Sequence, residues 1–297
     1  MENKQLKKEF DKLCKASIPK NEQELFHNLL CAIKKTGFCE AHIIHGAHNA
    51  VEYDSEKNYI DPVKKKTNPI KCELADMSFL VEDEKEVRFF LVQNKKAKKL
   101  KLKKDQFEAD LYQYELLHDR PVFRNTRGVS ISASMPYRGD ELKNAKTYSV
   151  STYGLFYKEC DEYDMRVYSA SHLNPIKSTG KSKDRTVRFN NTFATGPIVT
   201  NGIEEFADCE NLVVFEDGIR RNLIGEPIYH NRHGSRIMPA LLDFIRKTAE
   251  DYQEDNYITG DSPFEIPYNE GDNDNEVLRS LILNLYLHSD KIVAISL

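Results

Sequence analysis

The sequence predicts a layered α/β or α+β fold in which helices pack against a central sheet. Amphipathic helical patterns open the chain, apolar stretches of strand length follow, and further helical patterns stand near the end. With 297 residues, the chain is long enough to bury a large core, as one domain or as a domain with an appendage.

Two helices are predicted at the beginning of the chain. Residues 1–18 carry a thin apolar stripe, and Pro19 ends that pattern. Asn21 is a suitable N-cap for an amphipathic helix over residues 22–35. Glu22 is expected at the edge of the buried face of this second helix.

A β-hairpin is the next predicted unit. Residues 74–81 read as its first strand, residues 82–85 as its polar turn and residues 87–93 as a strongly apolar second strand. A lysine-rich segment over residues 95–104 and a helix over residues 105–117 follow.

The rest of the chain gives weaker signals, and residues 171–235 show little periodicity. We expect further strands over residues 129–135, 147–157 and 165–169, and helices over residues 237–252 and 275–288. We therefore divide the chain into a core over residues 1–160 and a C-terminal region over residues 161–297. This region would serve substrate recognition or dimerisation, or would belong to the same domain.

Composition argues against a membrane protein and a disulfide-rich secreted protein. Charged residues make up 30% of the chain, and no apolar stretch approaches the ~20 residues that a membrane span needs. The first residues carry no apolar signal segment. The six cysteines are scattered without a CxxC pair, so we expect reduced thiols in a cytoplasmic protein.

The net charge of −4 conceals strong segregation of charge along the chain. Residues 64–104 contain 13 Lys or Arg and 6 Asp or Glu, whereas residues 250–276 contain 10 acids and no Lys or Arg. A basic block of this kind is suited to a polyanion such as a nucleic-acid backbone, or it is a solvated lysine-rich loop.

The residues with most chemical meaning lie on the predicted hairpin. Asp76 belongs to the first strand, and Gln93 and Lys95 follow at the end of the second. Residues two apart on a strand share a face, so Gln93 and Lys95 should project together, with Asp76 beside them. A carboxylate, an amide oxygen and an ammonium would then converge at one end of an apolar sheet.

This combination suits phosphodiester hydrolysis. Oxygen ligands from Asp76, Gln93 and Glu22 could hold Mg²⁺, which binds phosphate oxygens and lowers the pKa of a bound water. Lys95 could orient that water and stabilise charge on the phosphate.

The order of helix-Glu, strand-Asp and strand-Gln-x-Lys resembles the PD-(D/E)xK nuclease superfamily, in the Gln-x-Lys variant of Mrr-type restriction enzymes. The resemblance covers roughly residues 20–160 and implies a restriction-endonuclease-like mixed central sheet flanked by helices, with C-terminal helical additions. It makes Asp76 the central metal ligand, Gln93 the second acidic position, Lys95 the catalytic lysine and Glu22 the carboxylate of the first helix. The helix carrying Gln113 resembles the one that follows the catalytic lysine in many members.

Two positions depart from the family pattern. Ala75 stands where a proline would precede the aspartate, and Gln93 supplies a neutral amide in place of an acid. An amide oxygen binds Mg²⁺ more weakly than a carboxylate, so Glu73 or Glu22 would have to compensate, or the site would be degenerate.

We therefore expect a DNA endonuclease that depends on Mg²⁺, with Mn²⁺ as a substitute, in restriction or phage defence. The basic block would follow the DNA backbone through Lys96, Lys98, Lys99, Lys101, Lys103 and Lys104. A homodimer fits this expectation, and a membrane partner does not. The alternatives are a catalytically inactive DNA-binding or assembly subunit with the same fold, and an RNA nuclease with the same chemistry.

A second phosphate-binding signal is rejected. Residues 178–182 read Ser-Thr-Gly-Lys-Ser, like the end of a nucleotide-binding loop, but Pro175 occupies the position of the first glycine. The histidines at 42, 45 and 48 lie three residues apart, and Gly46 argues against a helix that would align them for a transition metal.

Overall fold

The computed structural model describes residues 5–37, 39–44, 50–55, 69–82, 86–96, 106–125, 138–139, 141–176, 186–190, 196–230 and 241. Several predicted elements lie outside these residues: the strand over 129–135, the helix over 275–288 and, apart from Leu241, the helix over 237–252.

The two N-terminal helices form as predicted. Helix α1 spans Gln5–Ala16 and helix α2 spans Glu22–Thr36. Asn21 caps α2 by accepting a hydrogen bond from the backbone N–H of Glu24 at 2.8 Å, and Gly37 ends it in the left-handed conformation with φ of 63°. In the described part of the chain, no helix is long and apolar enough to cross a membrane.

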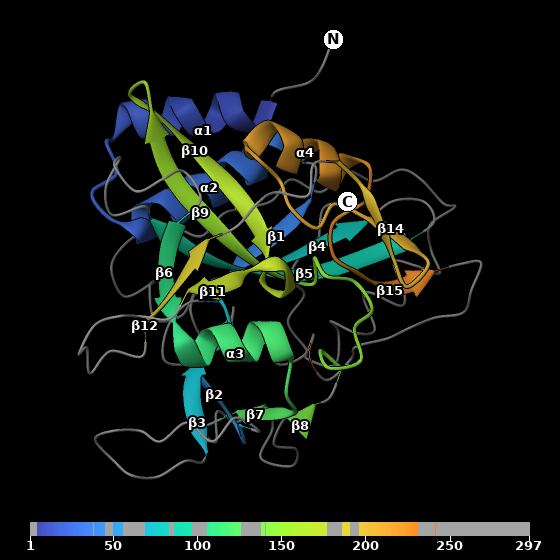
Figure 1. Cartoon of the computed structure of the whole chain (residues 1–297). Helices are drawn as coiled ribbons and strands as arrows, with labels where there is room; N and C mark the ends of the chain where they lie inside the picture. The colour runs from blue at the N-terminus through green and yellow to red at the C-terminus, as the bar shows by residue number, and fades with distance from the viewer. Residues whose placement is uncertain are drawn as a thin grey trace, which may run out of the picture.

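A mixed sheet forms the centre of the molecule (Figure 1). Its strands follow the order β1, β4, β5, β9, β10, with bounds Glu40–Ile43, Met77–Glu82, Glu86–Lys96, Ser151–Glu159 and Glu162–Ser169. Strands β4 and β5 pair antiparallel, as the predicted hairpin requires, whereas β5 and β9 pair in parallel. The α/β class is therefore confirmed.

Residues beyond position 160 complete this same sheet. Cys160 and Asp161, with φ of 49° and 67°, make the turn between β9 and β10, so the boundary drawn between residues 160 and 161 falls within a hairpin. Strand β15 (Glu226–His230) returns to pair with the first half of β5. The described residues on both sides of the boundary thus share one sheet.

Helices cover both faces of the central sheet (Figure 1). Helices α1, α2 and α4 (Leu212–Arg220) lie on one face, where Phe79 stacks on Phe90 at 4.5 Å between ring centroids and Phe215 meets both edge-on. Each such ring contributes roughly 1.5–3 kcal/mol through burial. Helix α3 (Leu111–Asp119) lies on the opposite face.

Smaller sheets surround this core. One contains β3 (Ile70–Glu73), β2 (Ala50–Tyr53), β7 (Phe123–Asn125) and β8 (Arg138–Gly139). A second contains β11 (Asn174–Ile176), β12 (Thr186–Asn190) and β6 (Gln106–Asp110), and a third pairs β13 (Ile198–Thr200) with β14 (Ile203–Glu205). A 3₁₀ turn, η2, spans Ala170–His172.

The helix predicted over residues 105–117 was wrong in its first part. Residues 106–110 form β6, which pairs antiparallel with β12, and α3 begins only at Leu111. Phe107 and Ala109 alternate with more exposed residues, a spacing of two that belongs to a strand. Similarly, the unassigned stretch from residue 171 contains several strands of three to five residues, too short to show a period.

Substituting Gly154 on β9 tests the packing of the sheet. A Cβ at this position would lie 2.8 Å from Oδ1 of Asn94 and 3.0 Å from both Sδ of Met165 and Cγ1 of Val92. We expect Gly154→Ala to lower the free energy of unfolding by about 1–3 kcal/mol in urea denaturation. The control Ser17→Ala, at an exposed position, should change the free energy of unfolding little. If the two variants are equally stable, the close packing around Gly154 is contradicted.

Candidate functional site

The pairing of β4 with β5 brings Asp76 and Gln93 together. Met77 pairs with Val92, and the backbone N–H of Asp76 donates to the carbonyl of Val92 at 3.2 Å, so the register continues by one residue. Oδ2 of Asp76 accepts hydrogen bonds from Nε2 of Gln93 and from the backbone N–H of Asn94, both at 2.6 Å. The carboxylate is therefore fixed to the end of β5 by two donors.

Gln113 on α3 orients the amide group of Gln93. Nε2 of Gln113 donates to the backbone carbonyl of Glu73 at 3.3 Å and also to Oε1 of Gln93. Because a carbonyl can only accept, the nitrogen of Gln113 must face this way, and the oxygen of Gln93 must face Gln113. The nitrogen of Gln93 is then left to face Asp76. Donation therefore starts at Gln113, which donates to the carbonyl of Glu73 and to Gln93, and Gln93 in turn donates to Asp76.

Asp110 positions Gln113. Its Oδ1 accepts hydrogen bonds from the backbone N–H groups of Tyr112 at 2.9 Å and Gln113 at 3.2 Å, which makes it the N-cap of α3. The sequence prediction missed this role because it started the helix at residue 105. The available signal was an aspartate directly before the helical pattern that contains Gln113.

Lys95 and Glu22 meet at the same end of β5. Nζ of Lys95 lies 3.9 Å from Oε1 of Glu22 at the first position of α2. The side chain of Lys95 keeps 21% of its surface exposed and that of Glu22 keeps 33%, whereas Asp76 and Gln93 are only 1% and 2% exposed. The charged pair is therefore accessible to solvent, and the Asp76–Gln93 pair is largely covered.

These side chains fit a divalent cation only in part. Carboxylate oxygens of Asp76 and Glu22 have the chemistry that Mg²⁺ prefers. Gln93 does not fit as a ligand in its observed orientation, because its oxygen accepts from Gln113 and its nitrogen faces Asp76. Within the described residues, no group of three His, Cys, Asp or Glu side chains is arranged to hold a metal.

The predicted DNA-contacting lysines cannot be placed beside this site. Lys96 is the last residue of β5, and its side chain lies outside the described residues. Lys98, Lys99, Lys101, Lys103 and Lys104 also lie outside them.

Asn94 points to the other face of the sheet from Gln93 and is fully buried. Among the described residues, neither Nδ2 nor Oδ1 of its side chain has a hydrogen-bond partner. Gly154 on the adjacent strand leaves room for this amide, since a Cβ there would collide with Oδ1. A buried amide without partners costs about 1–3 kcal/mol, so Asn94 reduces the stability of the sheet beside the candidate site.

A second polar cluster joins the end of β10 to the turn η2. Oδ2 of Asp208 lies 3.2 Å from Nδ1 of His172, and Oδ1 of Asp208 accepts from the backbone N–H of Ser169 at 2.9 Å. The hydrogen bond to the buried Asp208 raises the pKa of His172, against an opposing effect of burial. The ring of Tyr148 lies 4.8 Å from that of His172, between centroids. Sequence reasoning did not identify this pair, because the two residues lie 36 positions apart.

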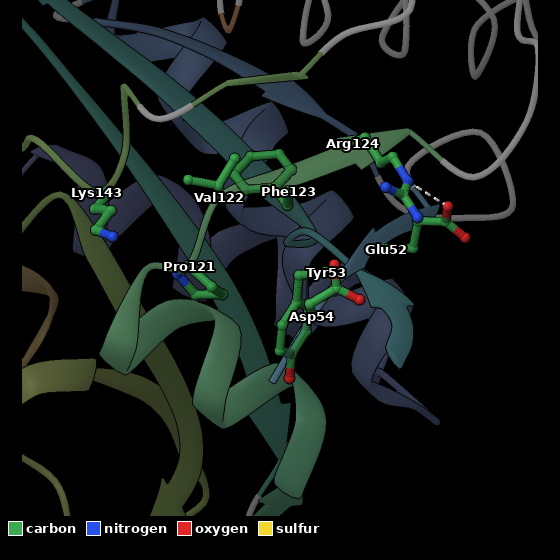
Figure 2. Close-up of a pocket in the computed structure, with 8 residues that line it drawn as sticks. All are labelled: Glu52, Tyr53, Asp54, Pro121, Val122, Phe123, Arg124 and Lys143. Carbon is green, nitrogen blue, oxygen red and sulfur yellow. Dashed lines mark hydrogen bonds and ion pairs between the residues drawn. The ribbon is translucent and has the colours of Figure 1, made fainter. Parts of the chain in front are cut away.

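A hollow of about 170 Å³ lies in the small sheet, at β2 and β7 (Figure 2). Pro121, Val122 and Phe123 form an apolar part of its wall. Arg124 binds Glu52 there, with 2.5 Å between Nε and Oε1, and Lys143 approaches from another side (Figure 2). None of the four predicted catalytic residues lines this hollow.

Comparison with known proteins found no matching family model, no matching curated protein and no matching solved structure.

Removing the amides of Gln93 and Gln113 tests the hydrogen-bond chain. Each single change to leucine leaves buried polar partners unpaired and should cost about 1–3 kcal/mol in urea denaturation. Each single variant already loses the hydrogen bond between Gln93 and Gln113. The double variant should therefore lose at least ~0.5 kcal/mol less unfolding free energy than the sum of the two single losses. Strict additivity would mean that the two amides do not interact.

The stability of the fold should depend on pH through His172. Its pKa is raised in the folded state, so the protonated ring contributes its full stabilisation below the ordinary pKa of about 6.5. This contribution is lost as the pH rises through the higher folded-state value. Thermal denaturation between pH 5 and 9 should show this loss in the wild type and a smaller one in His172→Asn. If stability depends on pH in the same way in both proteins, the raised pKa of His172 in the folded state is contradicted.

Proposed function

We propose that this protein is a metal-dependent DNA endonuclease of the PD-(D/E)xK type. The observation that carries the proposal is the grouping of Asp76, Gln93 and Lys95 at one end of β5, with Glu22 of α2 beside Lys95. A carboxylate held by two N–H donors, with a partly exposed ammonium two residues along β5 from one of them, is suited to a phosphate that must be bound and attacked by water.

Each side chain has a role in this mechanism. The carboxylates of Asp76 and Glu22 would hold Mg²⁺, which would supply a bound water of lowered pKa and positive charge beside the phosphate. Lys95 orients the attacking water and stabilises the phosphate charge. Gln93 acts through its hydrogen bond to Asp76 and fixes the direction of that carboxylate, so it is a positioning residue here.

Two observations favour the competing function, a DNA-binding or assembly subunit that does not cut. Asp76 is almost completely covered, although an active site needs its carboxylate to be reachable by a cation. Gln93 also directs an N–H group toward Asp76, where a metal site would benefit from an oxygen. This alternative predicts DNA binding that a chelator does not change, and no cleavage with any metal.

The remaining assignments belong to the same proposal. They are a restriction-endonuclease-like fold, a role in restriction or phage defence in the cytoplasm, Mn²⁺ as a substitute for Mg²⁺, DNA contacts by the lysine block and a homodimer. RNA would be attacked by the same chemistry, so RNA and DNA substrates are tested side by side.

Cleavage of plasmid DNA tests the proposal. The wild type should cut with Mg²⁺ and stop with chelator, and Asp76→Asn or Lys95→Ala should reduce the rate at least about 100-fold. The matched controls Asp54→Asn and Lys143→Ala change the same residue types at exposed positions and should cut normally.

Different outcomes separate the alternatives. Undiminished cutting by both site variants would refute the assignment of Asp76 and Lys95. Chelator-independent DNA binding without any cutting by the wild type would favour the inactive subunit, and preferential cutting of RNA would identify an RNA nuclease.

A further inference from the structure

One row of paired residues runs across the central sheet from the candidate site to β10. Lys95 on β5 pairs with Leu155 on β9, and Leu155 pairs with Arg166 on β10. Residues that pair across neighbouring strands lie on the same face of a sheet, so Arg166 shares the face of Lys95 and Gln93. At about 4.8 Å between neighbouring strands, the Cα atoms of Lys95 and Arg166 are separated by about 10 Å.

The guanidinium group of Arg166 is stacked on an aromatic ring of the neighbouring strand. Its Cζ lies 5.1 Å from the centroid of the Tyr157 ring, and Tyr157 follows Leu155 by two residues on β9. Stacking orients the flat guanidinium, while the N–H donors in its plane can still reach a further acceptor. This planar fork of donors matches the oxygens of a phosphate group, so Arg166 has the chemistry of a phosphate-binding residue.

The stacked pair lies at the rim of the packed face of the sheet. Phe107 of β6 packs against Tyr153 and Tyr168, with 5.5 Å and 5.8 Å between ring centroids, and those two tyrosines are fully buried. Arg166 lies one row farther along the β9–β10 hairpin and Tyr157 lies two rows farther, and both are only half-buried. The hairpin continues there beyond the described end of β5 (Figure 1). A ligand at the end of β5 can therefore reach this pair.

We propose that Arg166 binds a phosphate of the nucleic-acid backbone that flanks the scissile phosphate, and that Tyr157 holds its guanidinium in position. A separation of about 10 Å corresponds to about three nucleotides, at ~3.4 Å of helix axis for each nucleotide of one strand. Contacts of this kind fix the register of the substrate on the protein and carry no sequence information. The inference rests on the proposed function, because it takes the phosphate bound at Lys95 as its reference point.

A carboxylate also stands near this pair, and its contacts direct it elsewhere. Asp164 on β10 pairs with Tyr157 on β9. Its Oδ1 accepts hydrogen bonds from the backbone N–H groups of Met165 at 2.7 Å and Leu212 at 2.9 Å. These two bonds hold the carboxylate toward the backbone of β10 and of α4, so we expect Arg166 to be the group that meets an incoming phosphate.

Arg221 provides a matched control. Its Cζ lies 5.5 Å from the centroid of the Phe206 ring, so it is also an arginine stacked on an aromatic ring. It caps the C-terminal end of α4, which packs on the opposite face of the central sheet from α3. Arg166→Gln and Arg221→Gln therefore remove the same charge from similar surroundings, and only Arg166 lies in the row of Lys95.

The test measures binding of a short DNA duplex by fluorescence anisotropy, in chelator and at several salt concentrations. Arg166→Gln should bind about tenfold more weakly than the wild type and lower the salt slope by about 0.9, the contribution of one phosphate. Arg166→Lys keeps the charge and should retain the slope, and Arg221→Gln should match the wild type in affinity and slope. Replacing single phosphates by neutral methylphosphonates should then reveal one position that weakens binding by the wild type but not by Arg166→Gln.

Failures of the two proposals give different results. If the wild type cuts DNA but Arg166→Gln binds it with the affinity and salt slope of Arg221→Gln, the phosphate contact is refuted and the nuclease stands. If the wild type binds without cutting and Arg166→Gln lowers the slope, the contact stands and the nuclease falls. If the wild type neither binds nor cuts DNA, both proposals fall.

Discussion

The hydrogen bonds from β5 to the carboxylate of Asp76 are the interactions on which the site depends. They exist because β4 and β5 pair in a register that continues from Met77 and Val92 to Asp76 and Gln93. A shift of one residue would turn Gln93 and Lys95 to the opposite face and separate Gln93 from Asp76. The aromatic residues of the hairpin resist such a shift, since Phe79 and Phe90 are fully buried against α4.

Two buried carboxylates from residues beyond position 200 hold the segment that leads into β9, the parallel partner of β5. Glu205 accepts from the backbone N–H groups of Tyr148 and Ser149, and Glu226 accepts from those of Lys146 and Thr147. These four residues lead into β9, so residues beyond position 200 fix the strand that lies beside the candidate site. A buried carboxylate that loses such donors is strongly destabilising, which makes the N-terminal and C-terminal parts of the central sheet interdependent.

The elements that could be predicted from the sequence are those with strong local signals. The caps and apolar stripe of α2 and the apolar run of β5 are clear local signals, and Glu22, Gln93 and Lys95 lie on these elements. Asp76 was expected on the first strand of the hairpin, but it lies directly before β4, which begins at Met77. The strands after residue 171 are too short to show a period, and β6 obtains its hydrogen bonds from β12, about 80 residues away. The orientation of Gln93 was also beyond local reasoning, because Gln113 and the carbonyl of Glu73 determine it from another element.

The central claim is that Asp76 becomes the ligand of a divalent cation at the end of β5. The most direct measurement is a crystal structure of the full chain with Mn²⁺, with the anomalous scattering of the metal used to locate it. We expect a peak within coordination distance of Asp76, on the side of Lys95 and Glu22. No peak at Asp76 with saturating metal, while the amide nitrogen of Gln93 still faces its carboxylate, would contradict the account.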